Sequence, residues 1–200
     1  MFSKSESRST AAWRISLWTT LAFAFGAAVA FGVVYAVVAH VIQERSDAWL
    51  SGEAEVLADV SRNTARDALY GRVVEEVAEL AEREVPDELN KRGEHVNTVF
   101  FLQVGPGEQP LWVGPSDKAP FVQAIHRASL ALATPGTIDV AGWKHSFRVV
   151  YRPIRQGSGI YLGFSDAGAR HMLHRLLRWF LSIWFAVTIF GFLVSFGGIY

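Results

Sequence analysis

The chain has 200 residues, half of them hydrophobic, with 19 basic and 19 acidic residues and no cysteine. The lack of cysteine excludes disulfide bonds, thiol catalysis and thiolate metal sites. The zero net charge conceals two unequal parts, because residues 43–95 carry fourteen acids and seven bases, whereas residues 96–178 carry nine bases and four acids. Bases scattered in this way are a poor signal for nucleic acid, so we expect no nucleic-acid partner.

Two long uncharged stretches, residues 15–42 and 179–200, dominate the hydrophobic pattern. An apolar run of about 18 residues or more without charge predicts a membrane-spanning helix. As helices these stretches would be about 42 Å and 33 Å long, against a hydrocarbon core of about 30 Å. We therefore expect the lipid bilayer as a partner, with transmembrane helix 1 over 15–42 and transmembrane helix 2 over 179–200.

The segment 1–14 is a basic tail, with three bases and one acid before the first stretch. The bias of Lys and Arg toward the inside of a membrane predicts a cytoplasmic N-terminus and an extracytoplasmic domain over 43–178. Three arginines before the second stretch favour the reverse orientation, but long translocated domains follow this bias weakly. A cleaved signal peptide is the alternative for the first stretch, and its apolar run is too long for one.

Small apolar residues recur at steps of three and four between Ser46 and Glu84, which predicts one helix continuous with the first span. Pro86 would end it, since proline disfavours a helical residue before it. The narrow stripe is typical of a coiled-coil seam or of a helix packed on one partner, and equally of ordinary core. The stripe comprises Ala54, Leu57, Val60, Thr64, Ala68, Gly71, Val74, Ala78 and Ala81.

After Pro86 the period changes to that of strands. Residues 99–104 and 111–113, joined by the turn residues 105–109, predict a hairpin. Residues 121–133 predict a helix closed by Pro135 and Gly136, and strands are expected over 137–140, 144–151 and 160–164. Asp166 is a candidate N-cap of a last helix that runs into the second span. The order predicts an α+β domain with a small antiparallel sheet and long membrane-contiguous helices, similar to a PAS-like fold.

Motifs for catalysis are missing from the sequence: no phosphate loop, nucleophile elbow, zinc-helix motif or dinucleotide turn is present. His171 and His174, three residues apart, could share a metal ion, but three arginines surround them and a structural or interfacial role is favoured. Glu75 and Glu76 are adjacent on a helix and point in different directions, so they are no acid–base pair. We expect no catalytic residue, no metal site and no cofactor in this chain.

One strand carries a basic cluster: Arg148 and Arg152 share a face, with His145 and Tyr151 close by in sequence. Guanidinium groups suit carboxylate or phosphate ligands, so these four residues are candidate ligand-binding residues for a small anion. Two alternatives stay open: the strand has a solvent face that is simply basic, or it pairs with the acidic long helix.

The layout resembles the N-terminal input region of bacterial two-component sensor histidine kinases. The local likeness lies in the strand–turn–strand–helix ending, FRVVYRPI at 147–154, the turn 157–159 and IYLGFS at 160–165, and in the ending FLVSFGGIY at 192–200, which is similar to a second span before a HAMP linker. The resemblance covers the whole chain as a pattern. The defining HAMP linker, phosphoacceptor helix and ATP-binding domain lie outside these 200 residues, so no catalytic residue is carried over.

The resemblance implies a sensor in the bacterial inner membrane with a periplasmic domain that detects a small ligand or a periplasmic protein. It would signal through the second span to a cytoplasmic kinase that uses ATP and Mg²⁺ and phosphorylates a response regulator. Such receptors are parallel homodimers, so Leu57, Val60, Thr64, Ala68 and Val74 would form a dimer or signalling seam. The alternatives are the input region of a chemoreceptor or of a cyclic-dinucleotide enzyme, or a complete two-span scaffold or assembly protein.

Overall fold

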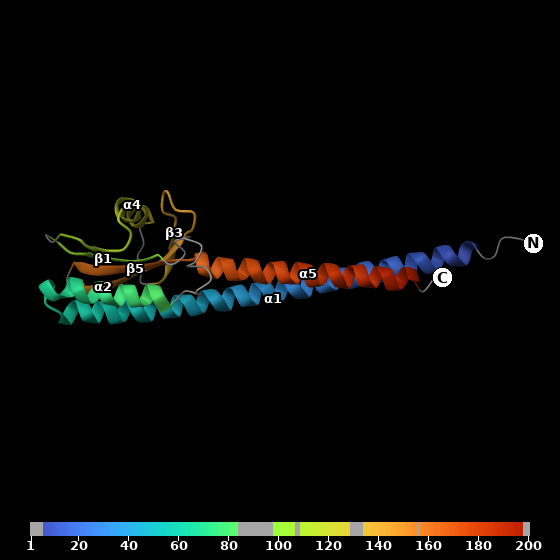
Figure 1. Cartoon of the computed structure of the whole chain (residues 1–200), viewed down its shortest axis with the longest axis horizontal. Coiled ribbons are helices and arrows are strands. Elements are labelled where there is room, and N and C mark those ends of the chain that lie inside the picture. Colours follow the sequence, from blue (N-terminus) through green and yellow to red (C-terminus); the bar gives the residue numbers. More distant parts are fainter. Residues whose placement is uncertain (1–5, 84–97, 107–108, 129–133, 156, 198–200) are drawn as a thin grey trace, which may run out of the picture. The chain divides into compact units, whose positions relative to one another are not determined.

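The structure, a computed structural model, describes residues 6–83, 98–106, 109–128, 134–155 and 157–197 (Figure 1). The chain divides into two compact units. One unit is Ile42–His171, and the other contains the residues before Ile42 and after His171. The helices α1 (Glu6–Asn63) and α5 (Ala167–Gly197) each contribute residues to both units.

The unit formed by the residues before Ile42 and after His171 is made of the N-terminal part of α1 and most of α5, which pack side by side. Trp184 Nε1 donates a hydrogen bond of 2.9 Å to Ala24 O, and the rings of Phe31 and Phe180 stack at 5.1 Å. Phe31 comes after Ala24 in α1, whereas its partner Phe180 comes before Trp184 in α5, so the two helices run antiparallel. Both are long and apolar enough to cross a membrane, over Leu17–Asn63 and Ala167–Leu193.

Large apolar side chains cover the outside of this helix pair. Phe25 is 72% exposed and Phe190 is 68% exposed, and many aliphatic neighbours are similar. Exposed apolar surface on this scale is unfavourable in water and is suited to lipid or to a partner surface. Two such helices suggest a membrane protein.

The second unit is built on a five-stranded antiparallel sheet with the order β2-β1-β5-β4-β3. Its strands are β1 (Val99–Val104), β2 (Leu111–Val113), β3 (Gly136–Ile138), β4 (Phe147–Arg155) and β5 (Ser158–Ser165). The predicted hairpin is confirmed, with Leu102 opposite Trp112. The expected α+β class with an antiparallel sheet is therefore confirmed.

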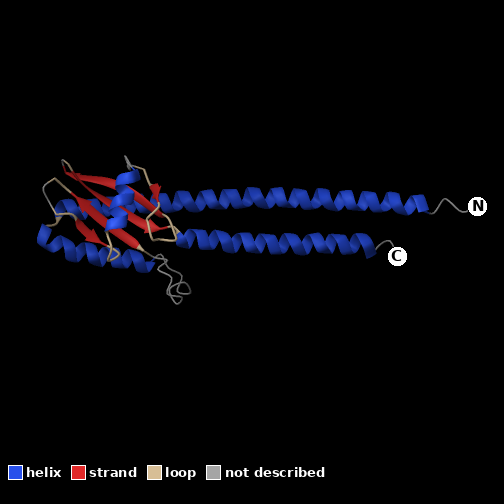
Figure 2. Cartoon of the chain, turned by 90° about the horizontal axis from the view of Figure 1, so that it is seen from above, coloured by secondary structure: helices blue, strands red, loops and turns tan. Residues whose placement is uncertain are grey.

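Helices cover both faces of the sheet. The C-terminal part of α1 and the helix α2 (Arg66–Arg83) lie on one face, and α4 (Ala119–Ala128) lies on the other (Figures 1 and 2). The α1–α2 face buries Leu57, Val73, Phe101 and Leu162, among others. The predicted helix 121–133 corresponds to α4, and its residues 129–133 lie outside the described part.

The α4 face of the sheet is filled by aromatic rings. Phe121 lies at its centre, with ring centroids 5.0 Å from Phe100, 5.1 Å from Phe147 and 5.5 Å from Trp143. Gly163 of β5 faces this cluster, and a Cβ atom there would collide with the Phe100 ring. Aromatic pairs in tilted and edge-on geometry contribute about 0.5–1.5 kcal/mol each beyond their burial.

The expectation of one continuous helix from Ser46 to Glu84 is wrong. Helix α1 ends at Asn63 and α2 starts at Arg66, so the chain reverses between them (Figure 1). Ser61, Asn63 and Thr64 favour this break, because their short polar side chains compete for backbone hydrogen bonds in a helix. The Ala65 carbonyl then accepts from Ala68 N and Leu69 N, which starts α2. Pro86, the expected end, lies outside the described residues.

The break also changes which residues are buried. Leu57 is fully buried and Val60 is half-buried against the sheet, but Ala68 and Val74 are exposed on α2. The buried set on α2 is Leu69, Val73, Val77 and Leu80. The predicted seam residues therefore do not share one helix face, and the Leu57 side chain belongs to the core of its own chain.

A polar pocket where α1 turns into α2

The predicted ligand cluster on β4 is divided by the alternation of the strand. Arg148 and Arg152 point to the face covered by α1, whereas Tyr151 lies on the opposite face, where its ring packs at 4.9 Å from Tyr161. His145 is half-buried before β4 begins. The four residues do not converge on one pocket.

Both arginines make ion pairs with α1. Arg148 Nε donates to Asp47 Oδ1 at 3.0 Å and its Nη2 donates to Asp47 Oδ2, while Nη1 donates to Thr137 Oγ1 at 2.7 Å. Arg152 Nε lies 3.5 Å from Glu55 Oε2. Of the two structural alternatives, pairing with the acidic helix is the one observed, and Arg148 is fully engaged by it.

The start of α5 contacts Ser146, the residue directly before β4. Arg170 Nη2 donates to Ser146 Oγ at 2.8 Å, and Arg170 Nε donates to Asp166 Oδ2 at 2.7 Å. Asp166 directly precedes α5, as expected of an N-cap, but Oδ2 binds Arg170 and Oδ1 is buried without a hydrogen-bond partner. Ser146, directly before β4, thus binds α5, and Arg148 of β4 binds α1.

Burial raises the pKa of the Asp166 carboxyl above its usual value of 3.8. The charge and hydrogen bond of Arg170 and the charge of His145 partly offset this rise, and Asp139 adds to it. On the other side of the sheet, burial and then the neighbouring Tyr151 raise the pKa of Tyr161. The carboxyl with the raised pKa, that of Asp166, therefore lies at the start of α5, beside the contact between Arg170 and Ser146.

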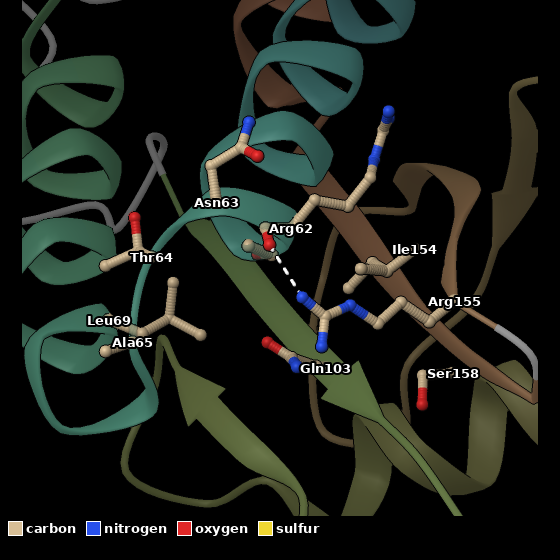
Figure 3. A pocket seen from close by; sticks show the side chains of 10 residues that line it. Arg62, Asn63, Thr64, Ala65, Leu69, Gln103, Ile154, Arg155 and Ser158 are labelled. Atoms are coloured by element: carbon tan, nitrogen blue, oxygen red, sulfur yellow. Dashed lines mark hydrogen bonds between the residues drawn. The ribbon is translucent and has the colours of Figure 1, made fainter.

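A pocket of about 350 Å³ lies at the opposite end of β4, where α1 ends and α2 begins (Figure 3). Its volume is at the lower end of the ~300–1,000 Å³ typical of small-molecule sites. Three segments form it: the helix turn, the C-terminal end of β1 and the hairpin from β4 to β5. The lining residues are Ser61, Arg62, Asn63, Thr64, Ala65, Leu69, Gln103, Ile154, Arg155 and Ser158.

A β-bulge directs Arg155 into this pocket. Pro153 pairs with Gly159 and Arg155 pairs with Ser158, so Ile154 is the extra residue. Strict alternation would put Arg155 on the face opposite Ile154, but a bulge re-aims the side chains that follow it. Arg155 Nη2 consequently donates a hydrogen bond of 2.9 Å to Arg62 O at the end of α1 (Figure 3).

Several polar atoms around the pocket are buried without a hydrogen bond. They are Ser61 Oγ, Arg62 Nε and Gln103 Oε1. Arg62 is balanced by Glu55 at 2.9 Å and Asp59 at 3.9 Å, and Figure 3 shows its side chain directed away from Gln103. Native proteins leave few buried polar atoms unpaired, so Ser61 Oγ and Gln103 Oε1 mark a place where a bound molecule would complete the hydrogen bonding.

Among these lining residues, only Thr64 was predicted from the sequence as a functional residue, and for a dimer or signalling seam. The signals were present: Ser61, Asn63 and Thr64 favour a helix break, and Pro153 inside a strand is typical of a bulge or an edge. His171 and His174 are exposed on α5, and the described residues hold no group of three or more metal-ligating side chains.

Comparisons of the chain with protein-family models, with curated proteins and with solved structures find no match. The class that the coordinates define is an α+β protein with two candidate membrane-spanning helices. The chemistry of a ligand that could bind the pocket is therefore inferred from the residues that line it.

Proposed function

We propose that the chain is the membrane-bound input region of a signal sensor, and in particular of a two-component sensor histidine kinase in a bacterial inner membrane. Residues 15–42 and 179–200 are proposed as its spans, with the N-terminus in the cytoplasm and residues 43–178 in the periplasm. One observation supports this above others: α1 and α5 each combine an exposed apolar segment with a residue that binds the folded unit, at Arg148 of β4 for α1 and at Ser146 directly before β4 for α5.

The folded unit is proposed as a PAS-like sensor domain. In its favour, the sheet is small and antiparallel, a long N-terminal helix covers one face, and a short helix between β2 and β3 covers the other. The chain also leaves the sheet through β5 directly into α5, with only Asp166 between them. A change in the sheet would therefore reach α5 without an intervening loop.

Transmission would use the contacts at the N-terminal end of β4. Arg148 connects β4 to α1 through Asp47, and Ser146, directly before β4, connects the strand to α5 through Arg170. A ligand that binds one conformation of the domain better than another shifts the population toward it. Packed helices respond by displacements of about 1–2 Å, which α5 would pass through the membrane.

The proposed partners are a second copy of the chain in a parallel homodimer, a small ligand or periplasmic protein as stimulus, and a response regulator for the output. ATP and Mg²⁺ would belong to a kinase domain outside these 200 residues. Since Leu57 is buried within its own chain, it is no part of the proposed dimer contact.

Phosphorylation of the natural protein tests this function. Membranes that contain the protein at its natural length are incubated with radiolabelled ATP and Mg²⁺, and the label is tested for acid lability. We expect acid-labile phosphohistidine that transfers to a response regulator. Absence of labelling would contradict the kinase assignment and favour a chemoreceptor, a cyclic-dinucleotide enzyme or a scaffold.

A further inference from the structure

The lining of the pocket has the polarity of an anion site. Among the described residues no acidic side chain lines it, whereas hydroxyl groups, amide groups and the Arg155 guanidinium do (Figure 3). A guanidinium offers five N–H donors in a planar fork that matches carboxylate and phosphate oxygens. Among the described residues, Arg155 gives one hydrogen bond, to Arg62 O, and has no carboxylate within ion-pair distance. Most of its donors therefore remain available to a ligand.

Gln103 supplies a second recognition group beside Arg155. Its Oε1 is buried without a partner, and its amide lies next to the guanidinium in Figure 3. A half-turn of the amide exchanges its oxygen and nitrogen, so the group can accept from Arg155 and can also donate to an oxyanion. Ser61 Oγ, also buried without a partner, adds a rotatable hydroxyl.

The two helix ends at the pocket have opposite electrostatic effects on the binding of an anion. The start of α2, directly after Ala65, carries the positive end of its helix dipole and favours an anion, while the last carbonyls of α1 disfavour one. Arg155 already binds one of those carbonyls, that of Arg62, which reduces the opposing effect. The positive charge of Arg155 then gives the pocket its preference for an anion.

Leu69 and Ile154 give the pocket a short apolar wall. The volume and this wall admit a compact molecule with a few carbon atoms rather than a polymer or a lipid chain. We propose that this pocket binds a small oxyanion, a short-chain carboxylate or a phosphate, with Arg155 as the anchoring charge and Gln103 and Ser61 as hydrogen-bonding partners. Binding stands independently of the signalling function; that the oxyanion is also the stimulus rests on the proposed function.

Calorimetric titration of the full 200-residue chain in lipid nanodiscs tests the pocket. The probes are malate, citrate and inorganic phosphate at up to millimolar concentrations, with glycerol as an uncharged comparison. We expect saturable binding of at least one anion and none of glycerol. A response to carboxylates alone identifies a carboxylate site, and a response to phosphate alone identifies a phosphate site.

Two variants locate the binding. Arg155→Gln should weaken it about tenfold to a hundredfold, the loss of a charge-assisted hydrogen bond, while Arg72→Gln, an exposed arginine of α2 outside the pocket, should leave it unchanged. If Arg155→Gln fails to fold, Gln103→Glu keeps the side-chain shape, places a negative charge in the pocket and should abolish binding. Absence of saturable binding, or binding unaffected by both pocket variants, would overturn the proposal.

Phosphorylation separates this proposal from the proposed function. An oxyanion that binds through Arg155 but leaves the labelling of the natural protein unchanged would support the pocket and contradict its role as the stimulus. Loss of labelling in all conditions would contradict the kinase assignment alone.

Discussion

At the scale of residues, two arginines of β4 make ion pairs with α1 in different surroundings. The side chains of Arg148 and Asp47 are 15% and 26% exposed, whereas Glu55, the partner of Arg152, is 61% exposed. Two hydrogen bonds join the first pair, and the second pair is separated by 3.5 Å. The first pair should therefore stabilise the fold and the second should contribute little, because solvent screens exposed ion pairs.

Double-mutant cycles measure this difference. We expect a coupling of about 1–3 kcal/mol between Asp47→Asn and Arg148→Gln in the free energy of unfolding, as for half-buried hydrogen bonds to charged groups. The matched cycle of Glu55→Gln with Arg152→Gln should give less than about 1 kcal/mol. Chemical denaturation followed by tryptophan fluorescence reports both couplings, and equal values would refute the distinction.

Asp166 predicts a pH dependence of stability. Because its pKa is raised in the folded state, mainly by burial, its protonated form favours folding. This contribution is complete below the usual value of 3.8 and is lost as the pH rises through the raised folded pKa. Relative to Asp166→Asn, which does not titrate, the natural protein should lose stability from acidic to neutral pH. A difference between the two proteins that stays constant with pH would contradict this.

At the scale of elements, the strands were predicted correctly and the helix break was missed, although Ser61, Asn63 and Thr64 favour it. Residues 99–104 and 111–113 are short runs rich in β-branched and aromatic residues, separated by Gly and Pro, so local chemistry alone identifies both strands and their hairpin. The assumption of one continuous helix over 46–84 placed Ala68 and Val74 on the buried face. The residues of α2 that are buried are instead Leu69, Val73, Val77 and Leu80, because the chain reverses at Thr64 and Ala65 and brings them onto the sheet.

Two neighbouring valines of α2 test the reversal. Val73 is fully buried and Val74 is 36% exposed. Val73→Ala should lower the free energy of unfolding by about 1–3 kcal/mol through lost burial and a cavity. Val74→Ala should change it by no more than about 0.5 kcal/mol, as surface substitutions do. Denaturant titration compares them, and a larger effect at Val74 would restore the seam over Thr64, Ala68 and Val74.

The pocket could be predicted only in part. The turn from β4 to β5 was expected, and Gly157 there has a φ of 76°, a left-handed conformation that glycine adopts without strain. The orientation of Arg155 was not predictable, because it depends on the register shift beside Pro153 that only the pairing of two strands reveals. The charge alternation of β4 suggested a ligand at Arg148 and Arg152, and tertiary pairing with α1 accounts for both.

At the scale of the whole molecule, β4 relates the proposed ligand site to the two long helices. Arg155 lies at the pocket and Arg148 binds α1, about 23 Å apart along a strand that rises ~3.3 Å per residue. A sheet strand held at both ends can transmit a displacement, as the proposed sensor function requires. That function depends on α1 and α5 crossing a membrane with the folded unit on the outer side.

Cysteine labelling of the 200-residue chain tests this arrangement most directly, because these residues include no cysteine. Single cysteines are introduced as Ser116→Cys, at an exposed position of the folded unit, and as Ser5→Cys in the N-terminal tail. With a membrane-impermeant maleimide on spheroplasts, we predict labelling of Ser116→Cys at once and of Ser5→Cys only after permeabilisation. Labelling of Ser5→Cys from outside, or of Ser116→Cys only after permeabilisation, would contradict the account.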